Sequence, residues 1–159
     1  MKTLIVYFSK LGNTQKVAET IADTLMQAGD ARAISVDELT ASALREADFL
    51  IVGSPTHSWN MPNAVQEFLS KMSYRSLVGK SVAVFDTSMK VWEPMMFLTA
   101  SHRLVLVLRI LGGKPLVRPK TFLVEKKATA MGRVNLRAGE IELAKAWANF
   151  LLKRLEQTL

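Results

Sequence analysis

The residues with the clearest chemical capacity lie between positions 9 and 14, where the chain reads Ser-Lys-Leu-Gly-Asn-Thr. This segment follows an apolar run at 3–8 and precedes a helical pattern with Val17 and Ile21 on one face. Such a turn gathers the unpaired N–H groups of a helix start and the positive end of the helix dipole at one point. Hydroxyl, amide and ammonium groups add donors, from Ser9, Thr14, Asn13 and Lys10. The segment therefore predicts a phosphate-binding loop, in which Gly12 lets the backbone close around a tetrahedral group.

Two common nucleotide motifs are absent from the sequence. There is no G-x-x-x-x-G-K-[ST] pattern, which would indicate a nucleoside triphosphate, and no G-x-G-x-x-G pattern, which would indicate a dinucleotide. A short loop with several hydroxyls and one charge is suited to a monophosphate, which hydrogen bonds can neutralise. For this segment alone, an ordinary solvent-exposed turn between a strand and a helix remains the alternative.

A second polar segment follows the apolar run 49–53 and reads Ser-Pro-Thr-His-Ser-Trp-Asn-Met-Pro, from Ser54 to Pro62. A polar loop of this length with one large aromatic residue is typical of a binding loop. Trp59 can stack on a flat ring while hydroxyls and main-chain groups bond the polar edge of that ring. The alternative for Trp59 is a half-buried packing role.

Both segments must be positioned by the elements around them. The apolar periodicity predicts strands near 3–8, 31–36, 48–53, 81–86 and 115–124, and helices near 14–28, 40–47, 62–72, 94–111 and 137–156. This alternation is the pattern of a doubly wound α/β fold with a parallel sheet, here as one domain over residues 1–159. The last strand is the weakest element, because Pro115 and Pro119 interrupt its beginning. The two polar segments then follow the carboxyl ends of strands, where such folds bind ligands.

The motifs together resemble a known family. The stretch Leu4–Thr14, continuing through Val17 and Ala18, resembles the signature by which flavodoxins bind the phosphate of FMN, and Gly53–Thr56 with Trp59 is similar to their second FMN loop. The likeness in element order covers essentially the whole chain and implies FMN as cofactor. It also implies a five-stranded sheet of order 2-1-3-4-5 in a three-layer sandwich. On this resemblance the phosphate would be held by Ser9, Lys10, Leu11, Gly12, Asn13 and Thr14. The isoalloxazine ring would be flanked by Pro55, Thr56, His57, Ser58, Trp59 and Asn60.

The resemblance also implies a third loop after the fourth strand. Its candidate contacts are Thr87, Ser88, Met89 and Trp92. Trp92 would take the stacking position that flavodoxins often give to a tyrosine, although a lid and a partner contact remain open for it. The chain departs from the common pattern here, since the loop has no tyrosine and no acidic residue at the positions after Asp86.

Charge separates this chain from the typically acidic flavodoxins. The net charge is +7, and residues 80–159 hold fourteen Lys and Arg against six Asp and Glu. From Arg109 to Arg137 there are eight basic residues and a single acid, Glu125. An acidic redox partner protein, an anionic membrane surface and a solvated basic face are all compatible with this pattern. Nucleic acid is the weakest partner, because the sequence shows no aromatic–basic interleaving and no nucleic-acid motif.

The predicted helix 94–111 contains the apolar run Leu104–Leu108, which leaves it little polar face. A homodimer through residues 95–111, a partner site, a membrane-surface contact and deep packing within the fold are the open interpretations. The run is too short for a membrane span. The chain has no cysteine and shows no secretory leader, so a cytoplasmic location is expected.

These observations predict an FMN-binding electron carrier that shuttles electrons between redox partners, with no catalytic side chain and no metal. The main alternative is a flavin-dependent quinone or protoporphyrinogen oxidoreductase that contacts a membrane surface. An interaction module that has lost its flavin is a third hypothesis, and the intact first loop and Trp59 argue against it.

Overall fold

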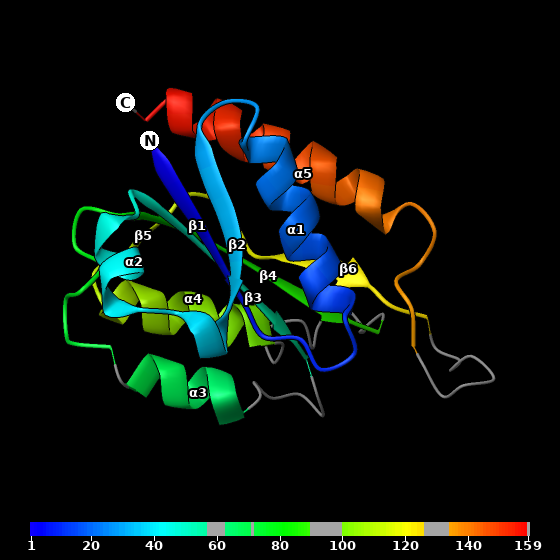
Figure 1. Ribbon diagram of the computed structural model, residues 1–159, viewed down its shortest axis with the longest axis horizontal. Coiled ribbons are helices and arrows are strands. Elements are labelled where there is room, and N and C mark those ends of the chain that lie inside the picture. The colour runs from blue at the N-terminus through cyan, green and yellow to red at the C-terminus, as the bar shows by residue number, and fades with distance from the viewer. Residues whose placement is uncertain (57–62, 71, 90–99, 126–133, 159) are drawn as a thin grey trace.

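Parallel strands form one sheet in the computed structural model, which describes residues 1–56, 63–70, 72–89, 100–125 and 134–158 (Figure 1). The strands of this part of the chain are β1 (Lys2–Tyr7), β2 (Asp30–Ser35), β3 (Phe49–Pro55), β4 (Ser81–Ser88), β5 (Lys114–Pro115) and β6 (Lys120–Leu123). The helices are α1 (Asn13–Leu25), the 3-10 turn η1 (Val36–Glu38), α2 (Ala41–Glu46), α3 (Asn63–Ser70), α4 (Ala100–Ile110) and α5 (Glu140–Glu156).

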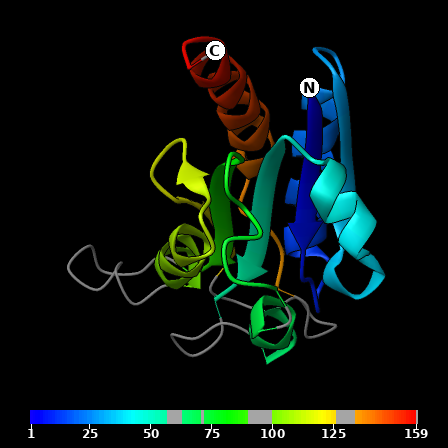
Figure 2. The same ribbon diagram turned by 90° about the vertical axis from the view of Figure 1, so that its left-hand side faces the viewer.

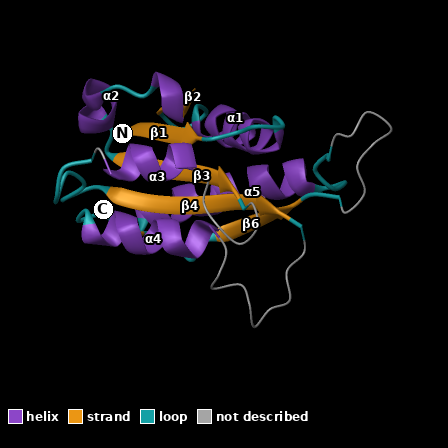
Figure 3. Cartoon of the chain, turned by 90° about the horizontal axis from the view of Figure 1, so that it is seen from below, coloured by secondary structure: helices purple, strands orange, loops and turns teal. Residues whose placement is uncertain are grey.

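The strand order confirms the predicted topology. The sheet runs β2-β1-β3-β4-β5, with all pairs parallel and β6 paired to β4. Figure 3 shows β1, β3, β4 and β6 side by side in this order, and in Figure 2 the arrows of β1 and β3 point toward the same end. The order reverses between β1 and β3, so the loops that follow these two strands leave the sheet on either side of a topological switch point.

The fifth strand position differs from the expectation of one strand over 115–124. β5 pairs with the first residues of β4, and β6 pairs with its last four, Phe85 to Ser88. Pro115 ends β5 and Pro119 precedes β6. A proline has no N–H to donate to a ladder and is confined to strand ends and edges. The two prolines therefore bracket a gap, and the single predicted strand becomes two short ones.

The helices cover the two faces of the sheet and complete a three-layer arrangement. Strand residues alternate between the faces, so Ile5 joins the core beneath α1 and α5, whereas Leu4 and Val6 join the core beneath α2, α3 and α4. At the centre of the first core, the rings of Phe85, Phe122 and Trp147 meet edge to face, with centroids 5.8–6.2 Å apart. Gly53 lies opposite Phe85 in the register, and a Cβ there would come within 2.2 Å of the Phe85 ring.

Helix α4 packs on the sheet with one face and exposes apolar side chains on another. Leu104, Leu108 and Leu111 are buried in the second core, whereas Leu106 is 61% exposed and Ile110 is 58% exposed. The apolar run 104–108 is thus divided between core and surface. None of the helices that the structure describes is long and apolar enough to cross a membrane.

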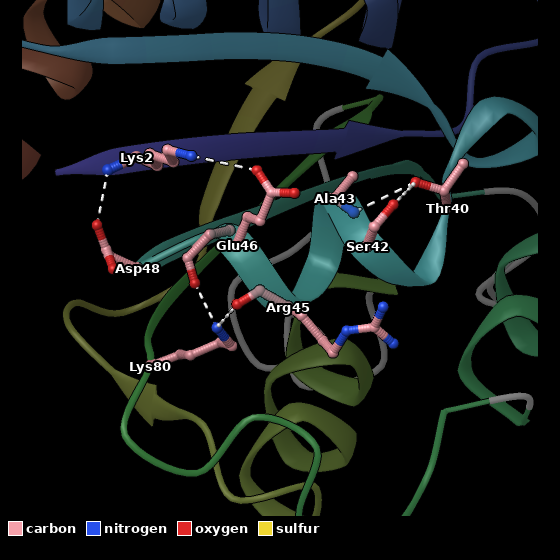
Figure 4. Close-up of polar contacts among 9 residues, drawn as sticks. Lys2, Thr40, Ser42, Ala43, Arg45, Glu46, Asp48 and Lys80 are labelled. Carbon is pink, nitrogen blue, oxygen red and sulfur yellow. Dashed lines mark hydrogen bonds and ion pairs between the residues drawn. The ribbon is translucent and has the colours of Figure 1, made fainter.

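Polar contacts connect β1, α2 and the segment before β4 at the end of the sheet where the strands begin (Figure 4). The Lys80 ammonium donates to the carbonyls of Arg45 (2.8 Å) and Ala47, and so holds the carboxyl end of α2. The Lys2 ammonium pairs with Glu46 at 3.1 Å. These contacts lie at the opposite end of the strands from the predicted binding loops.

Candidate functional site

The loop between β1 and α1 has the geometry of an anion site. Gly12 takes the left-handed conformation with φ of 84°, which residues with a Cβ rarely adopt. Gly12 has no side chain to cap α1, and the first turn of α1 contains no acidic residue. The leading N–H groups and the helix dipole therefore face the loop without an internal anion to neutralise them. Lys10 and Leu11 are exposed at the loop tip.

Ser9 supplies the most informative atom of this loop. Its hydroxyl oxygen is buried and has no hydrogen-bond partner among the described residues. A buried polar atom without a partner is uncommon in folded proteins and costs free energy unless a ligand or water satisfies it. The hydroxyl oxygen of Ser88, the last residue of β4, is also buried without a partner among the described residues. Two buried hydroxyls and an uncapped helix start fit a phosphate group and its neighbouring polar atoms.

The three predicted segments meet at the end of β4. The Thr14 hydroxyl lies 2.8 Å from the Thr87 hydroxyl, and the Thr56 N–H donates to the Thr87 carbonyl at 3.0 Å. One of the two hydroxyl hydrogens of the Thr14–Thr87 pair joins the two oxygens, so the other hydrogen can serve a further acceptor. Residues that are 73 positions apart in the chain therefore form one buried contact.

Asn13 has a further structural task. Its side-chain amide donates to the Val134 carbonyl at 2.6 Å, and the residue is buried. This bond connects the predicted phosphate loop to the segment that leads into α5. It uses one of the two amide hydrogens and leaves the other available.

The remaining predicted residues divide into described and undescribed positions. Pro55 is buried at the end of β3, Ser88 is buried at the end of β4, and Met89 is 55% exposed. The other predicted ring contacts, His57, Ser58, Trp59, Asn60 and Trp92, lie outside the described residues.

Sequence reasoning missed the central position of Asp86. This residue is fully buried in β4, where its two carboxylate oxygens accept hydrogen bonds of 2.6 Å from the hydroxyls of Thr56 and Thr121. Burial raises the pKa of the Asp86 carboxyl above its ordinary value, while hydrogen bonds from Thr121, Thr56 and Ser101 and the charge of His102 act in the opposite direction. An aspartate directly after the apolar run Val82–Phe85 was the available signal.

A separate groove lies on the α2–α3 side of the molecule. It has a volume of about 660 Å³, and its walls include Val36, Leu44, Phe68 and Met72. No residue of the predicted phosphate and ring loops lines it. The groove is therefore distinct from the site at the ends of β1, β3 and β4.

Comparisons with known proteins agree with this geometry. The sequence model of the family described as "Flavodoxin domain" matches residues 4–145. A flavodoxin from Clostridium saccharobutylicum is 29% identical over 77% of this chain and 81% of its own length. An NAD(P)H dehydrogenase (quinone) from Geobacter sulfurreducens is 30% identical over 55% of this chain and 58% of its own length.

Solved structures extend the comparison to the whole fold. A flavodoxin from the domain Archaea superposes with a TM-score of 0.77, covering 98% of this chain and 99% of its own, at 23% sequence identity. That likeness concerns the fold, whereas the family match rests on the sequence of residues 4–145. The chain belongs to the flavodoxin family of FMN-binding electron-transfer proteins.

Proposed function

We propose that this protein carries electrons between redox partner proteins and holds its FMN with the three segments that meet at Thr87. The Ser9–Thr14 loop would bind the phosphate, and the segments after β3 and β4 would flank the ring. The observation that carries the assignment is the buried Ser9 hydroxyl, which has no partner in the part of the chain that the structure describes, beside a helix start without a side-chain cap. Bound FMN supplies the redox chemistry, and the chain supplies orientation and hydrogen bonds.

A carrier and a quinone-reducing enzyme should differ in a direct measurement. We expect the photoreduced protein, mixed anaerobically in a stopped-flow instrument with a water-soluble naphthoquinone, to react slowly and without saturation. It should exchange electrons faster with a flavodoxin reductase. The likeness to the Geobacter dehydrogenase is what favours the enzyme as a second candidate. Fast, saturable reduction of the naphthoquinone, or of the protein by NAD(P)H alone, would assign the enzyme function instead.

The basic surface is the second part of the proposal. Arg109, Lys114 and Arg118 are exposed along the end of α4 and the β5 region, and we call these three residues the basic edge. Leu106 and Ile110 expose apolar side chains on α4, the helix that carries Arg109. Lys126, Lys127 and Arg133 lie outside the described residues. Clustered positive charge steers an acidic surface toward it, so we assign the basic edge to an acidic redox partner.

Charge reversal tests this assignment. The triple variant Arg109→Glu, Lys114→Glu and Arg118→Glu should slow association with an acidic electron-transfer protein at least tenfold at low salt, because steering depends on unscreened charge. The matched control reverses Lys16, Arg32 and Arg45, which are exposed on α1, β2 and α2, toward the β2 edge of the sheet and away from β5. The rates come from stopped-flow mixing at several salt concentrations.

Equal slowing by both triple variants would show that only net charge matters, and no slowing would leave the basic edge as a solvated face. Co-sedimentation with anionic but not neutral vesicles, lost only in the basic-edge variant, would assign the surface to lipid. The homodimer through residues 95–111 and the cytoplasmic location stay predictions.

A further inference from the structure

Asp86, near the predicted FMN loops, has a buried carboxylate that accepts several hydrogen bonds, and the resemblance to flavodoxins assigns no role to this residue. Asp86 lies near the carboxyl end of β4, between the core residue Phe85 and the strand residue Thr87. Because neighbouring side chains of a strand point to opposite faces, Thr87 meets α1 while Asp86 points toward α4. Asp86 is therefore on the other face of the strand from the phosphate contact.

The contacts of Asp86 come from three separate elements. One oxygen accepts from Thr56, the first residue after β3, and the other accepts from Thr121 on β6. Ser101 in the first turn of α4 donates a further hydrogen bond. A buried carboxylate with both oxygens engaged is a rigid anchor, and removing one partner of such a group is costly. Thr56 is thus fixed by its side chain to Asp86 and by its N–H to Thr87.

We propose that Asp86 is a positioning residue of the FMN site: its carboxylate holds Thr56, the residue that follows β3, in the position from which Thr56 can contact the flavin ring. The proposal rests on the proposed FMN site. When a proton occupies one carboxylate oxygen, that oxygen becomes a donor and the hydroxyls around it must reorient. Protonation of Asp86 therefore loosens the start of the loop.

The first test compares flavins with and without a phosphate. Asp86→Asn and Thr56→Val should each weaken riboflavin and FMN by the same factor, on the order of tenfold, as expected when one hydrogen bond to a charged group is lost. The ratio of the two affinities should stay constant, since the phosphate loop is untouched. The matched control is Thr24→Val, another buried threonine, whose hydroxyl bonds the Thr20 carbonyl within α1. It should change neither affinity by more than about twofold.

The second test measures the affinity for a flavin as a function of pH. Riboflavin is used because it has no phosphate group, so the titration of the FMN phosphate does not contribute. Wild-type affinity should rise with pH as Asp86 ionises, and the Asp86→Asn profile should be flat over the same range. Among the described residues, His102 on α4 is the titratable group whose charge acts on Asp86, so His102→Gln should keep the wild-type rise. Fluorescence quenching of the flavin gives each affinity.

The same variants separate positioning from a purely structural role. Folding raises the pKa of Asp86 above its ordinary value of 3.8, so between these two pKa values the folded protein keeps a proton that the unfolded chain has released. The free energy of unfolding therefore falls as the pH rises through this range. Wild type should therefore lose stability relative to Asp86→Asn through this window, in the absence of flavin. If stability follows this course but riboflavin affinity is independent of pH and of both substitutions, Asp86 is only structural and the proposal fails. If wild type binds neither flavin, the proposed function fails and the positioning role with it.

Discussion

Replacing Ser9 with alanine should reduce FMN affinity by about 10- to 150-fold and leave riboflavin affinity unchanged. The hydroxyl is buried without a partner in the described structure, so the apoprotein loses no hydrogen bond when it is removed. A hydrogen bond to a charged phosphate contributes about 1.5–3 kcal/mol, which corresponds to that range of affinity. Riboflavin has the same ring without the phosphate and serves as the internal reference. Titration of apoprotein with each flavin, followed by fluorescence, gives both affinities.

Ser76→Ala is the matched control, because the Ser76 hydroxyl is also buried without a partner among the described residues but lines the α2–α3 groove. It should leave both flavin affinities within about twofold. Urea unfolding of the two apoproteins should agree with wild type within about 0.5 kcal/mol. Equal loss of FMN and riboflavin affinity in Ser9→Ala would contradict the phosphate role of Ser9, since the change would then act on the ring or on the fold.

Replacing Phe122 with alanine should lower the free energy of unfolding by about 3–5 kcal/mol, as expected for a fully buried aromatic ring. Phe122 is 0% exposed on β6 and contacts the rings of Phe85 and Trp147. The substitution opens a cavity between the sheet and α5 and removes two edge-to-face contacts. A loss of this size is a large fraction of the free energy of unfolding of a domain of this length. Chemical denaturation of the apoprotein, followed by far-ultraviolet circular dichroism, measures the change.

Phe150→Ala supplies the control for the aromatic cluster. Phe150 is 46% exposed on the same helix that carries Trp147, and its ring lies 5.9 Å from the Arg154 guanidinium. An exposed cation–π contact contributes about 0.5–1 kcal/mol, so the cost should stay in that range. A loss of less than about 2 kcal/mol in Phe122→Ala would show that β6 is not integral to the core. The two short strands at the sheet edge would then be a peripheral addition.

Much of the fold follows from local patterns in the sequence. The apolar runs of β1, β3 and β4 are continuous because strands covered by helices on both faces need apolar residues on both sides. The β1–α1 loop is equally local: Ser9, Gly12 and Thr14 lie within six positions, and the conformation of Gly12 follows from its residue type. Short-range patterns of this kind predicted the α/β alternation, and the strand order followed from the resemblance to flavodoxins that the motifs carry.

Other features depend on residues that are distant in the chain. The partners of Asp86 are 30 and 35 positions away, at Thr56 and Thr121, and no local periodicity relates them. The fifth strand is split because β5 pairs with the beginning of β4 and β6 pairs with its end. The apolar residues of α4 divide into a buried and an exposed set according to which side of the helix packs on the sheet. The sequence by itself thus determined the order of the elements and the glycine turn between β1 and α1, because hydrophobic periodicity and turn chemistry act within a few residues. Only the tertiary structure decided which polar groups meet in the buried site, because hydrogen bonds between hydroxyls and a carboxylate require atoms within about 3 Å, whatever their separation in sequence.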